Sequence, residues 1–118
     1  MATIENVTPI LRVEDIEASR RYYIQTLGFS LDWDAGGMIS VSRDHNAIML
    51  CERDQGQPGT WLWIGVDDAD SLFAEFSAKG ARIRSPPENF SWAYEFEVED
   101  PDGHVLRFGS EPKAPVAD

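Results

Sequence analysis

The sequence is short of cysteine, of histidine and of long apolar stretches. Its one cysteine, Cys51, excludes a disulfide within the chain and is typical of a reducing compartment. No apolar run approaches the roughly 20 residues that a membrane-spanning helix needs, and residues 1–6 contain neither a basic segment nor a signal-peptide core. We therefore expect a cytoplasmic protein with no membrane partner, and Cys51 as an ordinary buried thiol.

Basic residues are also scarce. Ten Lys and Arg stand against 21 Asp and Glu, so the formal net charge is −11 at pH 7. Nucleic-acid-binding proteins normally carry the opposite sign, and an anionic membrane surface would repel this chain. A cationic small molecule would be attracted, although solubility alone also explains an acidic surface. The charge argues against nucleic acid as a partner and leaves a cationic ligand open.

The sequence does contain enough apolar material for one domain. Its 118 residues are 42% hydrophobic and 11% aromatic, which argues against disorder. A repeat runs through it, because Val13-Glu14-Asp15 is matched 53 residues later by Val66-Asp67-Asp68. In both copies the Asp is a predicted helix N-cap, and a glycine, Gly28 or Gly80, ends the helix that follows.

Each repeat predicts the order strand, helix, strand, strand, strand. The fold class is therefore α+β, in which two βαβββ modules, 7–52 and 60–110, form a curved mixed sheet with the helices on its outer face. They make up a single domain, 1–118, and the free concave face suits a ligand. We expect a linker over 52–59, a proline-containing loop over 85–91, a frayed tail after 111, helices over 16–27 and 69–79, and strands over 7–13, 29–33, 38–42, 47–51, 60–66 and 81–84.

The most regular stretch, residues 92–108, predicts the last two strands. Glutamates alternate with apolar residues up to an Asp-Pro-Asp-Gly turn. A three-residue loop pairs Phe96 with Phe108 and Glu97 with Arg107, whereas a slip by one residue would place Phe108 among the glutamates. We expect the glutamates to face water, and Arg107 to form a cross-strand pair with Glu97.

Four tryptophans are many for a chain of this length. Trp61 and Trp63 point to the same side of their strand, and Trp33 and Trp92 stand at a strand end or in the loop before a strand. On the concave side the indoles could stack on a flat or cationic ligand. They could equally fill the core or a dimer interface. The nearby carboxylates that could attract a cation are Asp32, Asp34, Glu95 and Glu97.

These motifs resemble those of a known superfamily. The segments that carry the likeness are Val13–Tyr23, Leu27–Phe29, Val66–Asp68 and Asp100–Gly103. They are similar to those of the vicinal-oxygen-chelate superfamily, which includes glyoxalase I, bleomycin-resistance proteins, fosfomycin-resistance enzymes and extradiol dioxygenases. The resemblance covers about residues 7–110. It implies the fold, whereas an activity depends on the site residues.

The enzymes of this superfamily hold a divalent metal through His and carboxylate ligands. The corresponding positions here are Thr8, Met49, Trp61 and Arg107, which do not suit a hard metal. The resemblance therefore implies no metal, no other cofactor and no catalytic residue. The two histidines, His45 and His104, fall in or beside predicted turns, where we expect them to be solvated.

Within the superfamily, the bleomycin-resistance proteins resemble this chain best. Residues 92–96, Trp-Ala-Tyr-Glu-Phe, are similar to their Trp-Gly-Arg-Glu-Phe motif. Residues 61–64 resemble their aromatic strand, and residues 31–38 their aromatic-rich hairpin. Pro9 matches a proline in their first strand, where an N-terminal arm exchanges between protomers. The resemblance thus implies a homodimer and allows for an exchanged arm.

We therefore expect a metal-independent binding protein that sequesters a cationic or aromatic small molecule in a groove at a dimer interface. Two other interpretations stay open: a metal-dependent lyase or dioxygenase with an atypical site, and a small domain with a partner-binding or regulatory role. The expected ligand-binding residues are Trp33, Met38, Trp61, Trp63, Trp92, Glu97 and Arg107.

Overall fold

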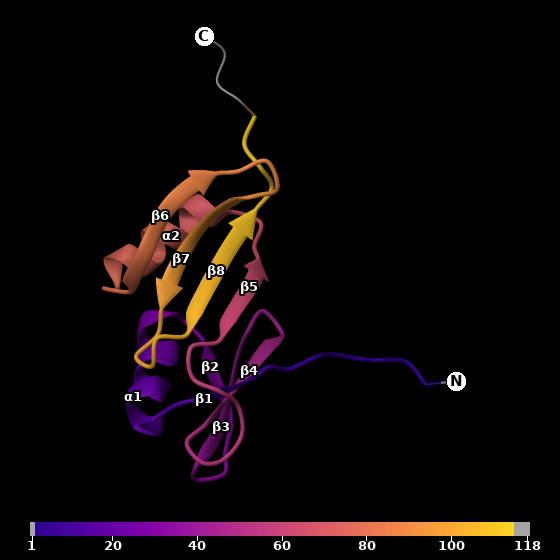
Figure 1. The fold of residues 1–118 in the computed structure, drawn as a ribbon, viewed down its shortest axis with the longest axis vertical. Helices are drawn as coiled ribbons and strands as arrows, with labels where there is room; N and C mark the ends of the chain where they lie inside the picture. Colours follow the sequence, from indigo (N-terminus) through magenta and orange to yellow (C-terminus); the bar gives the residue numbers. More distant parts are fainter. Residues whose placement is uncertain (1, 115–118) are drawn as a thin grey trace. The chain divides into compact units, whose positions relative to one another are not determined.

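The computed structural model describes residues 2–114, and the chain divides into two compact units, Met1–Pro58 and Gly59–Asp118. Each unit contains one four-stranded mixed sheet and one helical segment (Figure 1). The division falls within the predicted linker. No helix of residues 2–114 combines the length and the apolar character needed to cross a membrane.

The first unit has the sheet order β1-β4-β3-β2, with β1 parallel to β4 and the other neighbours antiparallel. Its core includes Leu11, Tyr23, Val41 and Leu50, and Cys51 is buried as expected. Its elements are β1 (Ile10–Arg12), α1 (Ile16–Arg21), η1 (Tyr22–Thr26), β2 (Ser30–Asp34), β3 (Met38–Arg43) and β4 (Asn46–Cys51).

The second unit repeats this arrangement. Its sheet order is β5-β8-β7-β6, again with the first strand parallel to the last. Helix α2 packs on one face, where Phe76 lies edge-on to Phe108 with ring centroids 5.2 Å apart. The repeat confirms the predicted α+β fold of two βαβββ modules. Its elements are β5 (Trp61–Gly65), α2 (Ala69–Ala78), β6 (Arg82–Asn89), β7 (Tyr94–Glu99) and β8 (Val105–Ser110).

Both helices begin at the predicted aspartates. The Asp15 carboxylate accepts hydrogen bonds from the backbone N–H groups of Glu17 and Ala18. The Asp68 carboxylate accepts one from the N–H of Ser71. These side chains satisfy donors that have no acceptor within the helix, and such a cap is worth about 0.5–2 kcal/mol. The repeated Val-acidic-Asp motif is therefore a pair of helix starts.

The first helix differs from the single α-helix predicted over 16–27. Its last part is a π-helical turn, in which the Leu27 N–H donates to the Tyr22 carbonyl at 3.0 Å. The widened turn places Tyr23 in the core, where its ring meets Phe29 edge-on with centroids 5.8 Å apart. Core packing thus overrides the regular α-helical spacing here.

The predicted loop over 85–91 is wrong for residues 85–89, whereas residues 90 and 91 do belong to a loop. Strand β6 continues through both prolines to Asn89, with two shifts of register against β7 between Ile83 and Glu88. The prolines are tolerated because β6 is an edge strand, and its bulges remove residues from the hydrogen-bonded ladder. A proline pair was therefore a poor signal for the end of this strand.

The hairpin of β7 and β8 has the predicted register. Phe96 lies opposite Phe108, and Glu97 lies opposite Arg107. The turn glycine, Gly103, has a φ of 78°, in the left-handed region that the loop requires. The prediction that the glutamates face water is wrong for Glu95, because only 4% of this residue is exposed.

His104 also differs from its prediction, because it is fully buried. Asp100 is buried beside it and accepts hydrogen bonds of 2.9 Å from the N–H groups of His104 and Asp102. The His104 ring accepts a 3.0 Å hydrogen bond at Nδ1 from the Thr60 N–H. The turn thus contains buried polar groups that satisfy one another. His45 is exposed, as expected.

We predict that Asp100→Ala lowers the free energy of unfolding by about 1–3 kcal/mol, because two backbone N–H groups lose their acceptor. Urea unfolding followed by circular dichroism measures the loss. Asp67→Ala, which removes an exposed carboxylate, is the control and should change stability by less than about 0.5 kcal/mol. Similar losses in both variants would contradict a structural role for Asp100.

Candidate functional site

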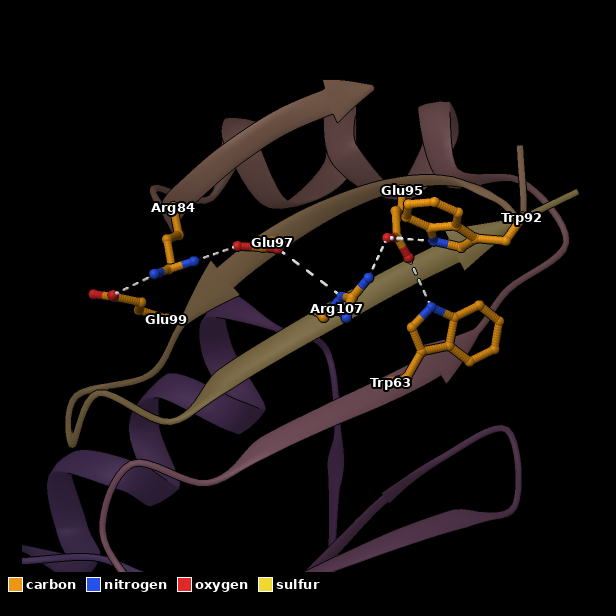
Figure 2. A network of polar contacts seen from close by, with 7 residues as sticks. All are labelled: Trp63, Arg84, Trp92, Glu95, Glu97, Glu99 and Arg107. Atoms are coloured by element: carbon orange, nitrogen blue, oxygen red, sulfur yellow. Dashed lines mark hydrogen bonds and ion pairs between the residues drawn. The ribbon is translucent and has the colours of Figure 1, made fainter. Parts of the chain in front are cut away.

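The face of the second sheet opposite α2 carries indole and charged side chains. Alternation along β7 and β8 turns Phe96 and Phe108 toward Phe76 of α2. The intervening residues project from the other face, together with side chains of β5, β6 and the loop after β6. We call this surface the tryptophan face; it comprises Trp61 and the seven residues of Figure 2, namely Trp63, Arg84, Trp92, Glu95, Glu97, Glu99 and Arg107.

The Glu95 carboxylate joins two of the indoles (Figure 2). Trp63 Nε1 donates to Glu95 Oε2 at 2.7 Å, and Trp92 Nε1 donates to Glu95 Oε1 at 3.1 Å. Arg107 Nη2 donates to the same Oε1 and forms an ion pair with it. Hydrogen bonds to a buried carboxylate are stronger than those between neutral groups. They fix the orientation of both indoles.

The same three donors keep Glu95 ionised. Burial of the carboxylate by itself raises the pKa of Glu95, but hydrogen bonds from Arg107, Trp63 and Trp92 and the Arg107 charge outweigh that effect. The pKa of Glu95 therefore lies below its ordinary value of 4.5. At neutral pH the carboxylate is an acceptor for all three N–H groups.

Trp63 lies flat on the sheet because two strand glycines make room for it. A Cβ atom at Gly109 would lie 2.7 Å from Trp63 Cζ2, and one at Gly65 would lie 3.2 Å from Trp63 Cζ3. A side chain at position 109 would therefore displace the indole. One face of the ring rests on the backbone, yet 54% of the residue is exposed. This geometry leaves the other face available for stacking.

Trp92 stands in the loop between β6 and β7 and is 62% exposed. Its ring stacks on that of Phe90, with centroids 4.7 Å apart and an interplanar angle of 11°. The Phe90 N–H donates to the Ala93 carbonyl at 2.9 Å, which closes the loop. Together with the hydrogen bond to Glu95, these contacts hold the second indole.

Lys113 holds both ends of this loop. Its backbone N–H and C=O form hydrogen bonds of 2.9 Å with the Asn89 side chain. Its ammonium pairs with Asp70 and lies 4.3 Å from the centroid of the Tyr94 ring. The hydrogen bond from Lys113 lowers the pKa of Asp70, and the hydrogen bond to Asp70 raises the pKa of Tyr94. The predicted fraying after 111 is thus wrong for Lys113; residues 115–118 lie outside the described part.

The third indole, that of Trp61, is in contact with an arginine side chain of the protein, Arg84. The Arg84 Cζ atom lies 4.8 Å from the centroid of the Trp61 ring, within the range of a cation–π contact. Arg84 also forms ion pairs with Glu97 at 2.6 Å and with Glu99 at 3.3 Å. Arg107 Nε lies 3.9 Å from Glu97 Oε2, so the predicted pairing of these residues exists but is loose.

Five of the seven residues expected to bind a ligand lie on the tryptophan face: Trp61, Trp63, Trp92, Glu97 and Arg107. The other two, Trp33 and Met38, belong to the first unit, on strands β2 and β3. Trp33 is 41% exposed, and Met38 is half-buried. The site described here is therefore that of the second unit alone.

Sequence reasoning missed Arg84, Gly65 and Gly109 as parts of this surface. Two signals were present. Arginines alternate along β6 as glutamates do along β7, which favours ion pairs between these neighbouring strands. A glycine inside a strand often marks a close approach of another group, and here that group is the Trp63 ring.

The model of the Glyoxalase/Bleomycin resistance protein/Dioxygenase superfamily matches residues 3–108. The chain belongs to this superfamily. No curated protein matches the chain. Membership by itself covers binding proteins and enzymes, so the chemistry of this superfamily member depends on its own side chains.

Solved structures of the superfamily fold resemble this chain over most of its length. TnmS3, described as an antibiotic binding protein from Streptomyces sp. CB03234, is 25% identical with a TM-score of 0.80, covering 96% of this chain and 100% of that one. A glyoxalase/bleomycin resistance protein from the same strain is 25% identical with a TM-score of 0.76, covering 89% and 99%. TioX from Micromonospora sp. ML1, at 18% identity, a TM-score of 0.80 and coverage of 91% and 98%, shows the fold alone.

The positions that hold the metal in enzymes of the superfamily do not fit one here. Thr8, Met49 and Trp61 provide a hydroxyl, a thioether and an indole, and the Arg107 guanidinium is paired with Glu95. Within residues 2–114, no group of three or more His, Cys, Asp or Glu side chains is placed to hold a metal ion. This donor set does not suit a divalent metal.

We predict that Glu95→Gln lowers the free energy of unfolding by about 1–3 kcal/mol at pH 7, because the charge that binds Arg107 is lost. The folded-state pKa of Glu95 is depressed, so its contribution is present above the ordinary value of 4.5 and is lost as the pH falls through the folded value. The gap between wild type and variant should therefore narrow in acid.

Urea unfolding at a series of pH values measures this gap. Glu88→Gln, an exposed position on the same sheet, is the matched control and should show no gap at pH 7. A gap for Glu95→Gln that stays constant from neutral pH into acid would contradict the stabilising role of the Glu95 charge.

Proposed function

We propose that this protein is a metal-independent binding protein that sequesters an aromatic small molecule on the tryptophan face. The observation that carries the proposal is the state of the three indoles, which are 50%, 54% and 62% exposed at Trp61, Trp63 and Trp92. Exposed indoles are costly unless they serve a contact, and two of these are fixed by a buried carboxylate. Such preorganisation reduces the entropy lost when a flat ligand stacks.

The likeness to TnmS3 supports a binding role, because that protein is described as an antibiotic binding protein. The donor set at the metal positions favours binding over the metal-dependent chemistry of other superfamily members. We propose that binding takes place in the cytoplasm, since the single cysteine is buried and unpaired.

A homodimer is part of the proposal. Residues 2–8 precede β1 and form no strand, and Ile4 and Val7 in this arm are 84% and 86% exposed. Apolar side chains exposed to this extent favour cover by a second copy. The resemblance to the bleomycin-resistance proteins is the ground for placing the ligand groove at the interface of that dimer.

We predict twice the chain mass in light scattering at micromolar concentration, and a shift toward the monomer when Ile4 and Val7 are both replaced by Ser. Glu5→Ser, in the same arm, is the control, because it changes no apolar contact. A wild-type monomer at these concentrations would reject the dimer and leave the tryptophan face as a monomeric site.

For binding itself we predict that ligands found in a screen of planar aromatic compounds quench tryptophan fluorescence. Trp63→Ala should weaken their binding by about 1–3 kcal/mol, the usual range for losing an anchoring aromatic side chain. Gly109→Ala should weaken it about tenfold, or ~1.4 kcal/mol, because the added methyl group displaces the Trp63 ring.

Gly65→Ala is the matched control, because its methyl group meets the same ring at 3.2 Å instead of 2.7 Å. Its effect in titration calorimetry should be smaller than that of Gly109→Ala. Binding that is indifferent to both Trp63→Ala and Gly109→Ala would place the ligand elsewhere and reject the proposed site.

A further inference from the structure

The charges of the tryptophan face bear on which aromatic molecules it accepts. The three glutamates that the tryptophan face comprises are each paired with an arginine. Glu97 and Glu99 pair with Arg84, and Glu95 pairs with Arg107. In the first unit, Asp34 pairs with Arg20 at 2.9 Å, whereas Asp32 accepts hydrogen bonds from the neutral hydroxyls of Ser40 and Ser42 and keeps its charge.

The Trp61 ring already has a cation–π contact with a side chain of the protein. Arg84 stands over the Trp61 ring and is held there by its ion pairs with two glutamates. A ligand cation would have to displace this guanidinium or lie beside it, and like charges at such a distance repel. The protein thus supplies its own cation where a cationic ligand would bind.

Hydrogen-bond donors, in contrast, remain available. Within the described part of the chain, Arg107 donates a hydrogen bond to Glu95 through Nη2. Its Nε, 3.9 Å from Glu97 Oε2, is buried and makes no hydrogen bond, so a ligand would meet the other guanidinium N–H groups. About a third of the Arg107 side chain is exposed (32%), and the guanidinium lies between Glu95 and Glu97 (Figure 2). Arginine N–H groups are directional donors that prefer oxygen acceptors.

We infer that the tryptophan face selects planar aromatic molecules that are uncharged and present an oxygen acceptor to Arg107, and that it discriminates against cations. This inference rests on the proposed function and names the class of its ligand. The net charge of −11 then serves solubility and long-range effects and does not define the ligand at the site.

The test uses two three-ring probes of nearly equal size. Acridone is neutral and carries a carbonyl acceptor, whereas 9-aminoacridine is a cation at neutral pH. Titration calorimetry and tryptophan quenching at low salt, where the net charge most favours the cation, give both dissociation constants. We expect acridone to bind at least tenfold more tightly.

Two variants assign the cause. Arg107→Lys keeps the charge beside Glu95 but loses the planar donors, and should weaken acridone binding at least fivefold. Arg84→Met uncovers Trp61 and removes the ion pairs of Arg84 with Glu97 and Glu99, and should strengthen 9-aminoacridine binding at least fivefold. Lys79→Met, at the end of α2 on the opposite face of the sheet, makes the same change in net charge and should alter neither constant.

The outcomes separate the inference from the proposed function. If 9-aminoacridine binds as tightly as acridone and Trp63→Ala abolishes its quenching, the selectivity is overturned while the aromatic-binding function stands. If the cation gains as much from Lys79→Met as from Arg84→Met, the role of Arg84 is overturned. If neither probe quenches the indoles at millimolar concentration, both the inference and the proposed function are overturned.

Discussion

A buried carboxylate needs hydrogen-bond donors to replace the water it has lost. At Glu95 these donors are side chains of the exposed tryptophan face. Two indole N–H groups and one guanidinium N–H converge on this side chain from β5, β8 and the loop before β7. The cost of desolvating one charge thus orders three large side chains. Surface tryptophans are usually free to change rotamer, whereas Trp63 and Trp92 are held. The rigidity of the tryptophan face depends on this one group.

The sheet beneath imposes a second condition. Trp63 can lie flat only because Gly65 and Gly109 carry no side chain, so the backbone of β5 and β8 is part of the surface. Beside it, Arg84 covers one indole and forms ion pairs with two glutamates. The result is an aromatic surface whose glutamates are all paired with arginines, in a strongly acidic protein. The net charge of the protein therefore favours a cationic ligand, whereas the paired charges of the tryptophan face do not.

The sequence predicted most of the fold because its signals are periodic. Alternation specified the register of β7 and β8, and the two aspartate caps located both helix starts. Prediction from the sequence failed where tertiary contacts determine the local structure. The examples are the π-helical turn around Tyr23 and the continuation of β6 through its prolines. Five of the residues expected to bind a ligand lie together on the tryptophan face. The central role of Glu95 was not predicted, because strict alternation puts every glutamate of β7 on the same face and does not distinguish their surroundings.

The contacts of Lys113 show that the part of the chain that supports the tryptophan face extends beyond the last strand. Within residues 2–114 the last strand ends at Ser110, and a boundary chosen from strands and helices would stop there. Such a shortened chain would keep both sheets but lose the side-chain and backbone contacts that Lys113 makes with Asn89, Asp70 and Tyr94. The loop that carries Trp92 would lose its anchor. Expression vectors and fusion proteins should therefore retain the chain through Lys113 and add any linker after it.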